Sequence, residues 1–136
     1  MSPSIEKGIK VLIAEAEKEI ETIDVKTALT MLDNSDYQFV DIRDIRELQR
    51  EGKIPGAHHA PRGMLEFWVD PDSPYHQEIF AQEKKYILYC AAAWRSALAT
   101  QTLQNMGMRN VCHIGGGFSE WKSQNAPIEQ LPERRP

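Results

Sequence analysis

The sequence predicts an α/β fold: a small central parallel sheet of about five short strands, flanked by helices on both faces, with an extra helix at the N-terminus. Helical apolar patterns alternate along the chain with short runs of β-branched and aromatic residues, and that order is typical of a parallel sheet covered on both faces. The chain has 136 residues, of which 41% are hydrophobic, and this suits one domain with one core.

The first predicted element is an amphipathic helix over residues 4–21. It lies in an N-terminal extension, residues 1–21, in front of a domain that spans residues 22–136. Ser4 can cap this helix. Its apolar residues form one stripe: Ile5, Ile9, Leu12, Ile13, Ala16 and Ile20. We expect the stripe to cover the core, and a homodimer contact through this helix is the alternative.

Two helices and a strand follow. Asp24 is the expected N-cap of the second helix, which continues through Leu32. A strand that starts at Tyr37 ends at Asp41, and the helix after it is closed by Gly52. The segment "IPGAHHAP" predicts a turn with a short extended piece, "GMLEFW" is helical, and "VDPDSPYHQ" is a loop with two prolines.

The second half of the chain repeats the alternation. A buried strand over residues 86–89 precedes a helix over 96–106, which Gly107 stops. The strand "NVCHI" then leads into the glycines at 115–117 and the short helix "FSEWKSQ". The polar tail "APIEQLPERRP" is expected to fray.

The bulk composition excludes several classes of partner. A net charge of −4 argues against nonspecific nucleic-acid binding, which needs a basic surface. No apolar run approaches the ~20 residues that a membrane helix requires, so we expect no membrane partner. Two cysteines make a poor disulfide framework for this length, and we therefore expect a reducing, cytoplasmic compartment.

Cys90 lies where a strand gives way to the N-terminus of a helix, in "YCAAAWRSALATQTLQNMG". The three small residues after it let the loop curl so that its amides point inward and form a nest for an anion. The following helix adds unpaired N–H groups and its positive end, and Arg95 adds a cation. The residue types at this junction therefore predict a cysteine nucleophile in an anion-binding loop.

Two other segments lie just past the ends of predicted strands. Asp41 and Arg43 follow one strand, and Gly115–Gly117 follow another. Ligands of open parallel sheets bind beyond the carboxyl ends of the strands, so we expect both segments to approach Cys90. We expect Asp41 to accept hydrogen bonds from backbone N–H groups, and a proton relay is the alternative. We expect the glycines to let the chain pass close to the loop.

The amides of the loop matter more than the acidity of the thiol. Lowering a thiol pKa from roughly 8.5 to about 6.5 raises the thiolate fraction at pH 7 about 25-fold. The thiolate of lower pKa is also a weaker nucleophile, and this reduces its reaction rate roughly 6- to 10-fold. One aimed donor that stabilises charge in the transition state contributes about 3 kcal/mol, which is over a hundred-fold. The main task of the loop is therefore to hold charge during the reaction.

Four motifs in order identify the chain, from about Ile23 to Ile128, as similar to the single-domain rhodaneses, which are sulfurtransferases. The motifs are "FVDIRD" at 39–44, "GKIPGAHHAPRG" at 52–63, "CAAAWRSA" at 90–97 and "HIGGGFSEW" at 113–121. Each motif alone is weak evidence for the family, but the order and spacing of all four match it.

The resemblance implies that the Cys90 thiolate takes a sulfur from a donor such as thiosulfate or a related persulfide. The Cys90 persulfide then passes this sulfur to a thiol or another nucleophile, and no cofactor is implied. Cys90 and Arg95 are the expected catalytic residues. The residues expected to form the loop or to bind substrate are Ala91, Ala92, Ala93, Trp94, Ser96, Asp41, Arg43 and Arg62.

Some of these roles have alternatives. Trp94 can line the mouth of the site or cover the core. Arg62 can recognise an anionic donor from a lid segment or be solvated. The four histidines lack metal-binding spacing to the cysteines, so no metal site is predicted, and Cys112 is expected to be buried and inert.

The sequence departs from the family pattern twice. Ala93 stands where the family loop has glycine, and if that position needs φ > 0 the alanine costs on the order of 1 kcal/mol. Lys53 stands where a histidine usually precedes "IPGA", and we expect it on the surface.

Two alternatives to a sulfurtransferase remain open. One is a non-catalytic rhodanese-like binding or regulatory module, against which the presence of Cys90 and Arg95 counts. The other is a phosphatase or arsenate reductase, whose sites typically place five residues between cysteine and arginine. Here four residues separate Cys90 from Arg95, and the shorter ring fits a sulfur atom better than a phosphate.

Overall fold

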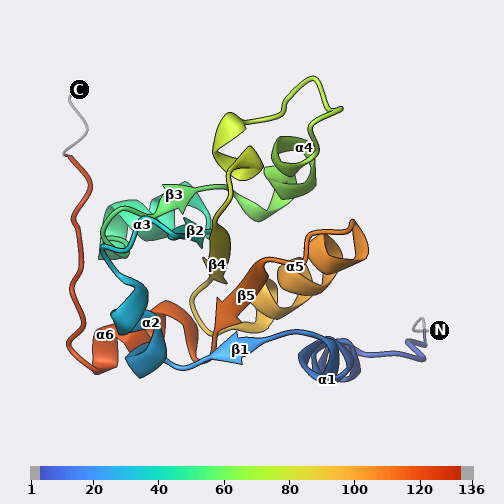
Figure 1. Ribbon diagram of the computed structural model, residues 1–136. Helices are drawn as coiled ribbons and strands as arrows, with labels where there is room; N and C mark the ends of the chain where they lie inside the picture. Colours follow the sequence, from blue (N-terminus) through green and yellow to red (C-terminus); the bar gives the residue numbers. More distant parts are fainter. Residues whose placement is uncertain (1–3, 133–136) are drawn as a thin grey trace.

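The computed structural model describes residues 4–132 and contains one sheet of five parallel strands (Figure 1). The spatial order is β1-β5-β4-β2-β3. The strands are β1 (Thr22–Ile23), β2 (Tyr37–Asp41), β3 (His58–His59), β4 (Lys85–Tyr89) and β5 (Val111–Ile114). The predicted fold class is confirmed. The strands β1 and β3, which form the two edges of the sheet, are only two residues long.

Helices cover both faces of this sheet. They are α1 (Ile9–Glu19), α2 (Val25–Met31), α3 (Ile45–Glu51), α4 (Leu65–Val69), α5 (Trp94–Asn105) and α6 (Gly117–Ser123), with short 3₁₀ turns at Arg62–Met64 and Glu78–Ala81. Figure 1 shows α2 and α6 on one side of β4 and β5, and α4 and α5 on the other. No helix among residues 4–132 is long and apolar enough to cross a membrane.

The strands are apolar on both sides because each side chain enters one of two cores. In the register of β2 and β4, Phe39 lies opposite Ile87 and Val40 lies opposite Leu88. Phe39 and Ile87 belong to the core under α2 and α6, whereas Val40 and Leu88 belong to the core under α4 and α5. This alternation across a doubly covered sheet explains why the sequence shows continuous apolar runs instead of a polar–apolar pattern.

The N-terminal helix is shorter than predicted and packs against another helix instead of the sheet. It begins after Gly8, whose N-cap position makes no side-chain hydrogen bond, so Ser4 is not the cap. Ile13 and Ala16 are buried against Ala97 of α5, whereas Ile9 is 47% exposed. Ile20, at the end of the predicted stripe, also packs against this cluster, whereas the first part of the stripe is uncovered.

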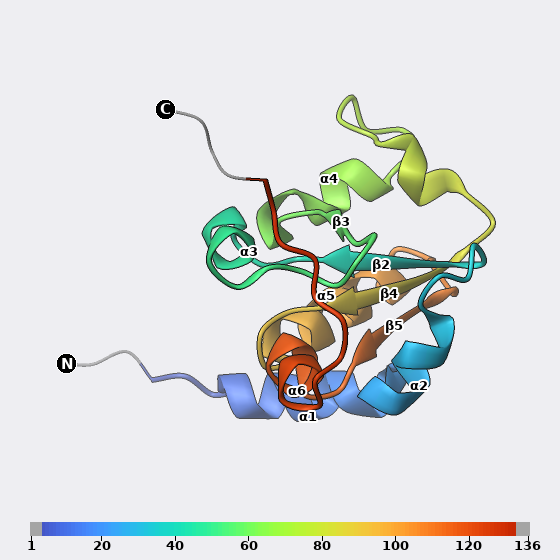
Figure 2. The same ribbon diagram turned by 90° about the vertical axis from the view of Figure 1, so that its left-hand side faces the viewer.

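The C-terminal segment is held to the domain, contrary to the expected fraying. Lys53 and Glu129 exchange both backbone hydrogen bonds, at 2.9 and 2.8 Å, and the Trp121 indole donates to the Pro127 carbonyl. In Figure 2 this segment, in red, runs across the face of the molecule that carries α6. Lys53 is half-buried and donates from Nζ to the Ala57 carbonyl, so it is not a free surface residue. The last four residues of the predicted tail lie outside the described residues.

The predicted helix boundaries near the site are confirmed by their caps. The Asp24 carboxylate accepts a hydrogen bond from the Thr27 amide at the start of α2. Gly52 closes α3 with φ of +83°, and a Cβ there would lie 2.6 Å from Cγ2 of Ile128. Only glycine meets both demands. Asp44 and Glu47 form a capping box at the start of α3, which fixes the helix next to the end of β2.

Candidate active site

Three segments meet at the carboxyl ends of the central strands, as predicted. Cys90 follows β4 directly, and the loop of residues 90–95, hereafter the Cys90 loop, leads into α5. Asp41 is the register partner of Tyr89, which immediately precedes Cys90. The glycines after β5 approach from the other side, where the Phe118 amide donates to the Cys90 carbonyl over 2.8 Å.

The carbonyls of the Cys90 loop are bound by α6, and this sets the direction of its amides. The amides of Phe118 and Ser119 donate to the carbonyls of Cys90 and Ala91, at 2.8 and 3.0 Å. In a planar trans peptide the next N–H points opposite to the carbonyl, so the amides of Ala91 and Ala92 point away from α6. Among residues 4–132, no protein group accepts a hydrogen bond from the amides of residues 91–95. Five donors are therefore free to bind an anion.

Gly117 allows this close approach of α6. A Cβ at this position would lie 2.5 Å from the Cys90 carbonyl oxygen and 2.7 Å from that of Ala91. The residue also has φ of +60°, which glycine adopts without strain. The predicted role of the glycine run is thus confirmed and assigned to one residue.

Ala93 holds a left-handed conformation, with φ of +76° and ψ of −5°. The position therefore needs the positive φ for which the family pattern supplies glycine. Alanine in this region is strained by roughly 1 kcal/mol. The strain is located at the N-cap of α5, where no side chain caps the helix.

The Cys90 thiol lies inside the loop at the start of α5. The Ser96 amide donates to Sγ over 3.4 Å, and Sγ lies 3.6 Å from Oγ of the same serine. Cys90 is only 1% exposed. This burial differs from the partly exposed setting typical of reactive thiols.

Beyond Ser96, a buried hydrogen-bonded chain continues to the edge of the sheet. Ser96 Oγ lies 2.8 Å from Nδ1 of His113, and Nε2 of His113 lies 3.0 Å from the Thr22 hydroxyl. Burial lowers the pKa of His113 to about 4. On the sequence alone His113 was considered only as a metal ligand, and its position inside an apolar strand was the one signal that pointed to a buried polar contact.

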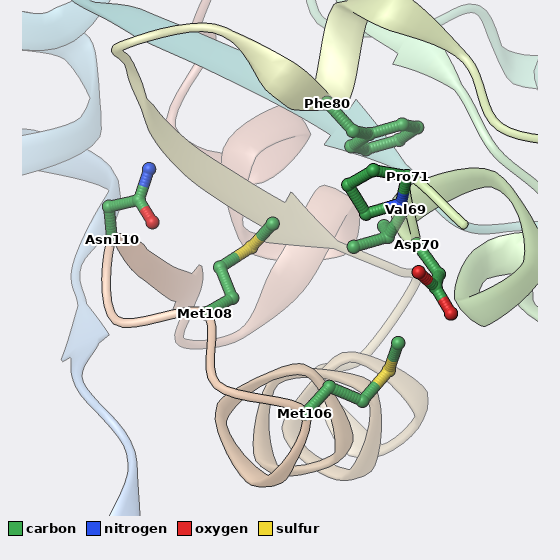
Figure 3. A pocket seen from close by; sticks show the side chains of 7 residues that line it. All are labelled: Val69, Asp70, Pro71, Phe80, Met106, Met108 and Asn110. Carbon is green, nitrogen blue, oxygen red and sulfur yellow. The ribbon is translucent and has the colours of Figure 1, made fainter. Parts of the chain in front are cut away.

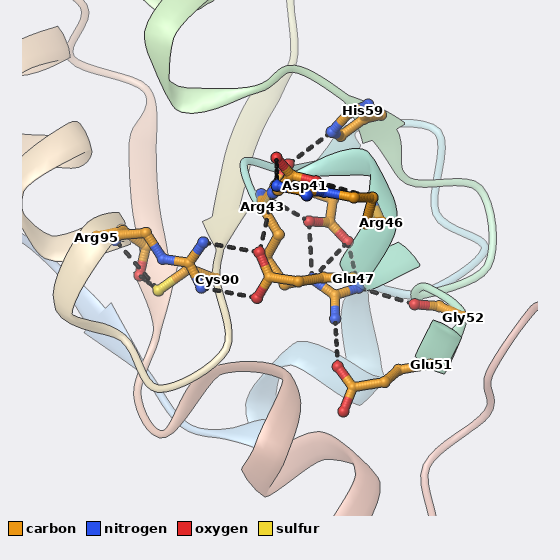
Figure 4. Close-up of polar contacts among 11 residues, drawn as sticks. Asp41, Arg43, Arg46, Glu47, Glu51, Gly52, His59, Cys90 and Arg95 are labelled. Carbon is orange, nitrogen blue, oxygen red and sulfur yellow. Dashed lines mark hydrogen bonds and ion pairs between the residues drawn. The ribbon is translucent and has the colours of Figure 1, made fainter. Parts of the chain in front are cut away.

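The side chain of Arg95 points away from the rest of the Cys90 loop to a carboxylate of α3. Its guanidinium makes two hydrogen bonds to the Glu47 carboxylate, at 2.9 and 3.0 Å (Figure 4). Arg95 holds the pKa of Glu47 below its usual value. Because Glu47 also caps α3, the pair joins the start of α5 to the start of α3. The guanidinium of Arg95, which is one of the two expected catalytic residues, thus binds a carboxylate and makes no hydrogen bond to the thiol.

Asp41 and Arg43 form a fully buried ion pair below the loop. The Arg43 Nη2 atom lies 2.7 Å from Oδ2 of Asp41 and 2.8 Å from the Gly52 carbonyl (Figure 4). Its guanidinium also lies over the Phe118 ring, 4.2 Å from the centroid. Asp41 accepts from the Arg43 amide as well, which confirms the predicted acceptor role. These side chains support α3 and α6 rather than face the thiol.

The remaining predicted residues lie around the site without touching the thiol. Trp94 is 49% exposed at the start of α5, so it does not cover the core. Arg62 pairs with Glu66 over 2.6 Å and approaches the Thr102 hydroxyl in α5. Cys112 is fully buried, and burial raises the pKa of its thiol to about 11, which agrees with the inert role expected for it.

A cavity of about 450 Å³ lies elsewhere, at the C-terminal end of α5 (Figure 3). Its lining residues are Val69, Asp70, Pro71, Phe80, Met106, Met108 and Asn110. Cys90 lies beyond the other end of this 12-residue helix, which spans about 18 Å, so the cavity is separate from the thiol. Within the described residues, no three His, Cys, Asp or Glu side chains are grouped so as to hold a metal ion.

Comparison with known proteins identifies relatives that match most of the chain. The thiosulfate sulfurtransferase GlpE of Vibrio cholerae is 28% identical over 107 residues, which cover 79% of this chain and 92% of that protein. The thiosulfate sulfurtransferase/rhodanese-like domain-containing protein 3 of Mus musculus is 28% identical over 97 residues. The match covers 68% of this chain but only 62% of the mouse protein, so this chain spans less than two thirds of that relative.

A solved structure from Rhodopseudomonas palustris, described as a protein of unknown function and possible tyrosine phosphatase, superposes with a TM-score of 0.92. It is 49% identical and the match covers 95% of this chain and 99% of that one. The family model of the rhodanese-like domain matches residues 24–124, from the N-cap of α2 to the end of α6. The chain therefore belongs to the rhodanese-like domain family.

Proposed function

We propose that the protein is a rhodanese-type sulfurtransferase that carries sulfur as a persulfide on Cys90. The observation that supports this most is the Cys90 loop itself. Five successive backbone amides of this loop have no acceptors among the described residues, and the thiol at its start already accepts a hydrogen bond from the Ser96 amide. Such a set of unpaired donors suits the anion that forms when a sulfur atom is added to a thiolate.

The chemistry needs no group beyond the thiol, a sulfur donor and an acceptor. The Cys90 thiolate attacks the outer sulfur of thiosulfate, so that a Sγ–S bond forms, the S–S bond of the donor breaks, and sulfite leaves with the electron pair. A nucleophile such as a thiol then attacks the terminal sulfur, and the Cys90 thiolate leaves. In both steps the negative charge stays next to the loop amides. One donor of this kind contributes about 3 kcal/mol to such a transition state.

The description of the Rhodopseudomonas palustris structure makes a phosphatase the second candidate. Two features of this chain count against it. The Arg95 guanidinium, which would have to face a bound phosphate, is held by both oxygens of Glu47. The three alanines of the loop add no side-chain donors for a dianion. Turnover of an aryl phosphate that is lost in Cys90→Ser would favour the phosphatase over the sulfurtransferase.

Incubation with thiosulfate followed by intact-mass measurement tests the proposal. We expect the protein to gain one sulfur atom, and cyanide or a thiol to remove it. Cys90→Ser should gain none, whereas Cys112→Ala should gain sulfur like the unaltered protein, because Cys112 is buried in β5. The proposal is wrong if thiosulfate, a mercaptopyruvate-type donor and glutathione persulfide all leave Cys90 unmodified.

A further inference from the structure

The hydrogen-bonded chain that starts at Cys90 leads from a buried thiol to an exposed residue. Ser96 and His113 are buried, with exposed fractions of 0% and 1%, whereas Thr22 at the sheet edge is exposed. The chain passes through Ser96 Oγ, both ring nitrogens of His113 and the Thr22 hydroxyl. We propose that Ser96, His113 and Thr22 form a reversible hydrogen-bond chain that releases the Cys90 proton to water and then stabilises the thiolate.

Every group in this chain can both donate and accept, and this makes the chain reversible. In the thiol state Cys90 donates to Ser96 Oγ, and the Ser96 hydroxyl donates to Nδ1 of His113. The proton on Nε2 then points to the Thr22 oxygen. This direction is compatible with all three contacts. The Ala93 carbonyl also lies 3.3 Å from Ser96 Oγ, but Nδ1 of His113 is the nearer acceptor at 2.8 Å.

Ionisation reverses the chain. The thiol proton passes to Ser96 as the Ser96 proton passes to Nδ1, the Nε2 proton passes to Thr22, and a Thr22 proton leaves to water. Afterwards Thr22 donates to Nε2, Nδ1 donates to Ser96, and the Ser96 hydroxyl donates to the thiolate. One proton has left the protein, and His113 has exchanged one neutral tautomer for the other. The three donors then point in one direction and polarise one another towards the sulfur.

The surroundings of His113 favour a neutral ring in both states. Burial alone lowers its pKa to about 4, so an imidazolium does not accumulate near pH 7. The charged groups on the neighbouring elements are paired elsewhere: Lys85 at the start of β4 with Glu21, and Arg95 at the start of α5 with Glu47. The Cys90 thiol is therefore the group to which His113 is joined through Ser96.

The function of this hydrogen-bond chain rests on the sulfurtransferase proposal. The experiment that tests the hydrogen-bond chain does not depend on that proposal. In the Cys112→Ala protein, thiolate absorbance follows the ionisation of Cys90 while imidazole ¹⁵N shifts report the His113 tautomer. We expect His113 to stay neutral between pH 6 and 10 and to change from Nε2–H to Nδ1–H at the midpoint of Cys90 ionisation. In Cys90→Ser the tautomer should not change with pH. A tautomer that stays constant while Cys90 ionises would overturn the inference.

A pair of substitutions on α5 separates this chain from a general loss of buried hydroxyls. Ser96→Ala removes the hydroxyl that donates to the thiolate, and we expect the thiolate fraction at pH 7 to fall about tenfold. Thr100→Val removes a buried hydroxyl one turn further along, which donates to the Ser96 carbonyl, and should leave Cys90 ionisation unchanged. Equal effects of both substitutions would contradict the inference.

The two proposals can fail separately. If the His113 tautomer follows Cys90 but no donor adds sulfur, the chain stands and the sulfurtransferase proposal falls. If sulfur is added but the tautomer does not follow Cys90, the sulfurtransferase proposal stands and the chain has no part in ionisation.

Discussion

At the scale of single residues, the candidate site depends on backbone amides rather than on a free cation. Arg95 is the cation within the Cys90 loop, and its guanidinium is engaged by Glu47. The positive end of α5 and the amides of residues 91–95 are left to balance negative charge on sulfur. A change in the loop backbone should therefore affect the site more than a change in a nearby charge, and Ala93 is where the backbone is strained.

Ala93→Gly should leave the free energy of unfolding unchanged or raise it by up to about 0.5 kcal/mol. The native φ of +76° is strained for alanine and not for glycine, and the relief of roughly 1 kcal/mol offsets the about 0.5–1 kcal/mol that a more flexible unfolded chain costs. Denaturant unfolding measures the change. Because the loop amides keep their direction, persulfide formation should be as fast as in the unaltered protein or faster.

Ala92→Gly is the matched control, since Ala92 lies in the same loop but does not have positive φ. There the substitution only adds freedom to the unfolded chain, so stability should fall by about 0.5–1 kcal/mol. If both substitutions destabilise the protein equally, the backbone at Ala93 is not strained.

At the scale of elements, the start of α5 is fixed by contacts from three neighbours. The amides of α6 bind the loop carbonyls, α1 packs on Ala97, and α3 is joined to α5 through Glu47 and Arg95. The last of these contacts is partly exposed, with 42% of the Arg95 side chain accessible, so its contribution to stability is modest. Its main effect is on the orientation of the first turn of α5.

Arg95→Ala and Glu47→Ala should each lower the free energy of unfolding by about 1 kcal/mol, and the double variant should lose less than the sum. A double-mutant cycle from denaturant unfolding measures this coupling. Across these variants, the rate of persulfide formation should fall as the free energy of unfolding falls, because the pair positions the helix and does not contact sulfur.

Arg46→Ala provides the comparison. Arg46 also pairs with a carboxylate of α3, but 80% of its side chain is exposed and it does not contact α5 through that pair. The variant should keep the rate of persulfide formation. If Arg95→Ala abolishes sulfur transfer without changing stability, then Arg95 acts on the donor directly and is not a positioning residue.

At the scale of the whole molecule, the sequence was sufficient for the order of elements and for the place of Cys90. Apolar runs, glycine stops and Asp N-caps are local signals, and α2, α3, β4 and α5 were predicted from them. Contacts between segments far apart in the sequence were not predictable in this way. The partner of Arg95 lies 48 residues away, and the partner of Lys53 lies in the tail. His113 was recognisable as a residue of the site only once β5 was placed beside β1 and α5.

The buried His113 should make the whole protein less stable at acid pH. Its pKa is about 4 in the folded protein and near 6.5 in an unfolded chain. Between these values the unfolded chain binds a proton that the folded protein does not, so stability is complete above about pH 6.5 and falls as the pH is lowered towards 4. The loss amounts to roughly 3 kcal/mol.

Denaturant unfolding between pH 7 and pH 4 measures this effect by comparing the unaltered protein with His113→Asn. The variant lowers stability at pH 7 but should show a shallower dependence on pH, because the amide side chain of asparagine does not titrate. Carboxylates such as Glu47 contribute equally to both proteins, and the difference between the two curves isolates His113. Parallel curves would show that His113 is not held neutral by burial.

The crystal structure of the protein after incubation with thiosulfate tests the central claim most directly. The claim predicts one additional sulfur atom bonded to Sγ of Cys90 and enclosed by the Cys90 loop, with the amides of residues 91–95 directed at it. A terminal sulfur that points away from these amides, or a thiol that stays unmodified beneath a closed loop, would contradict it.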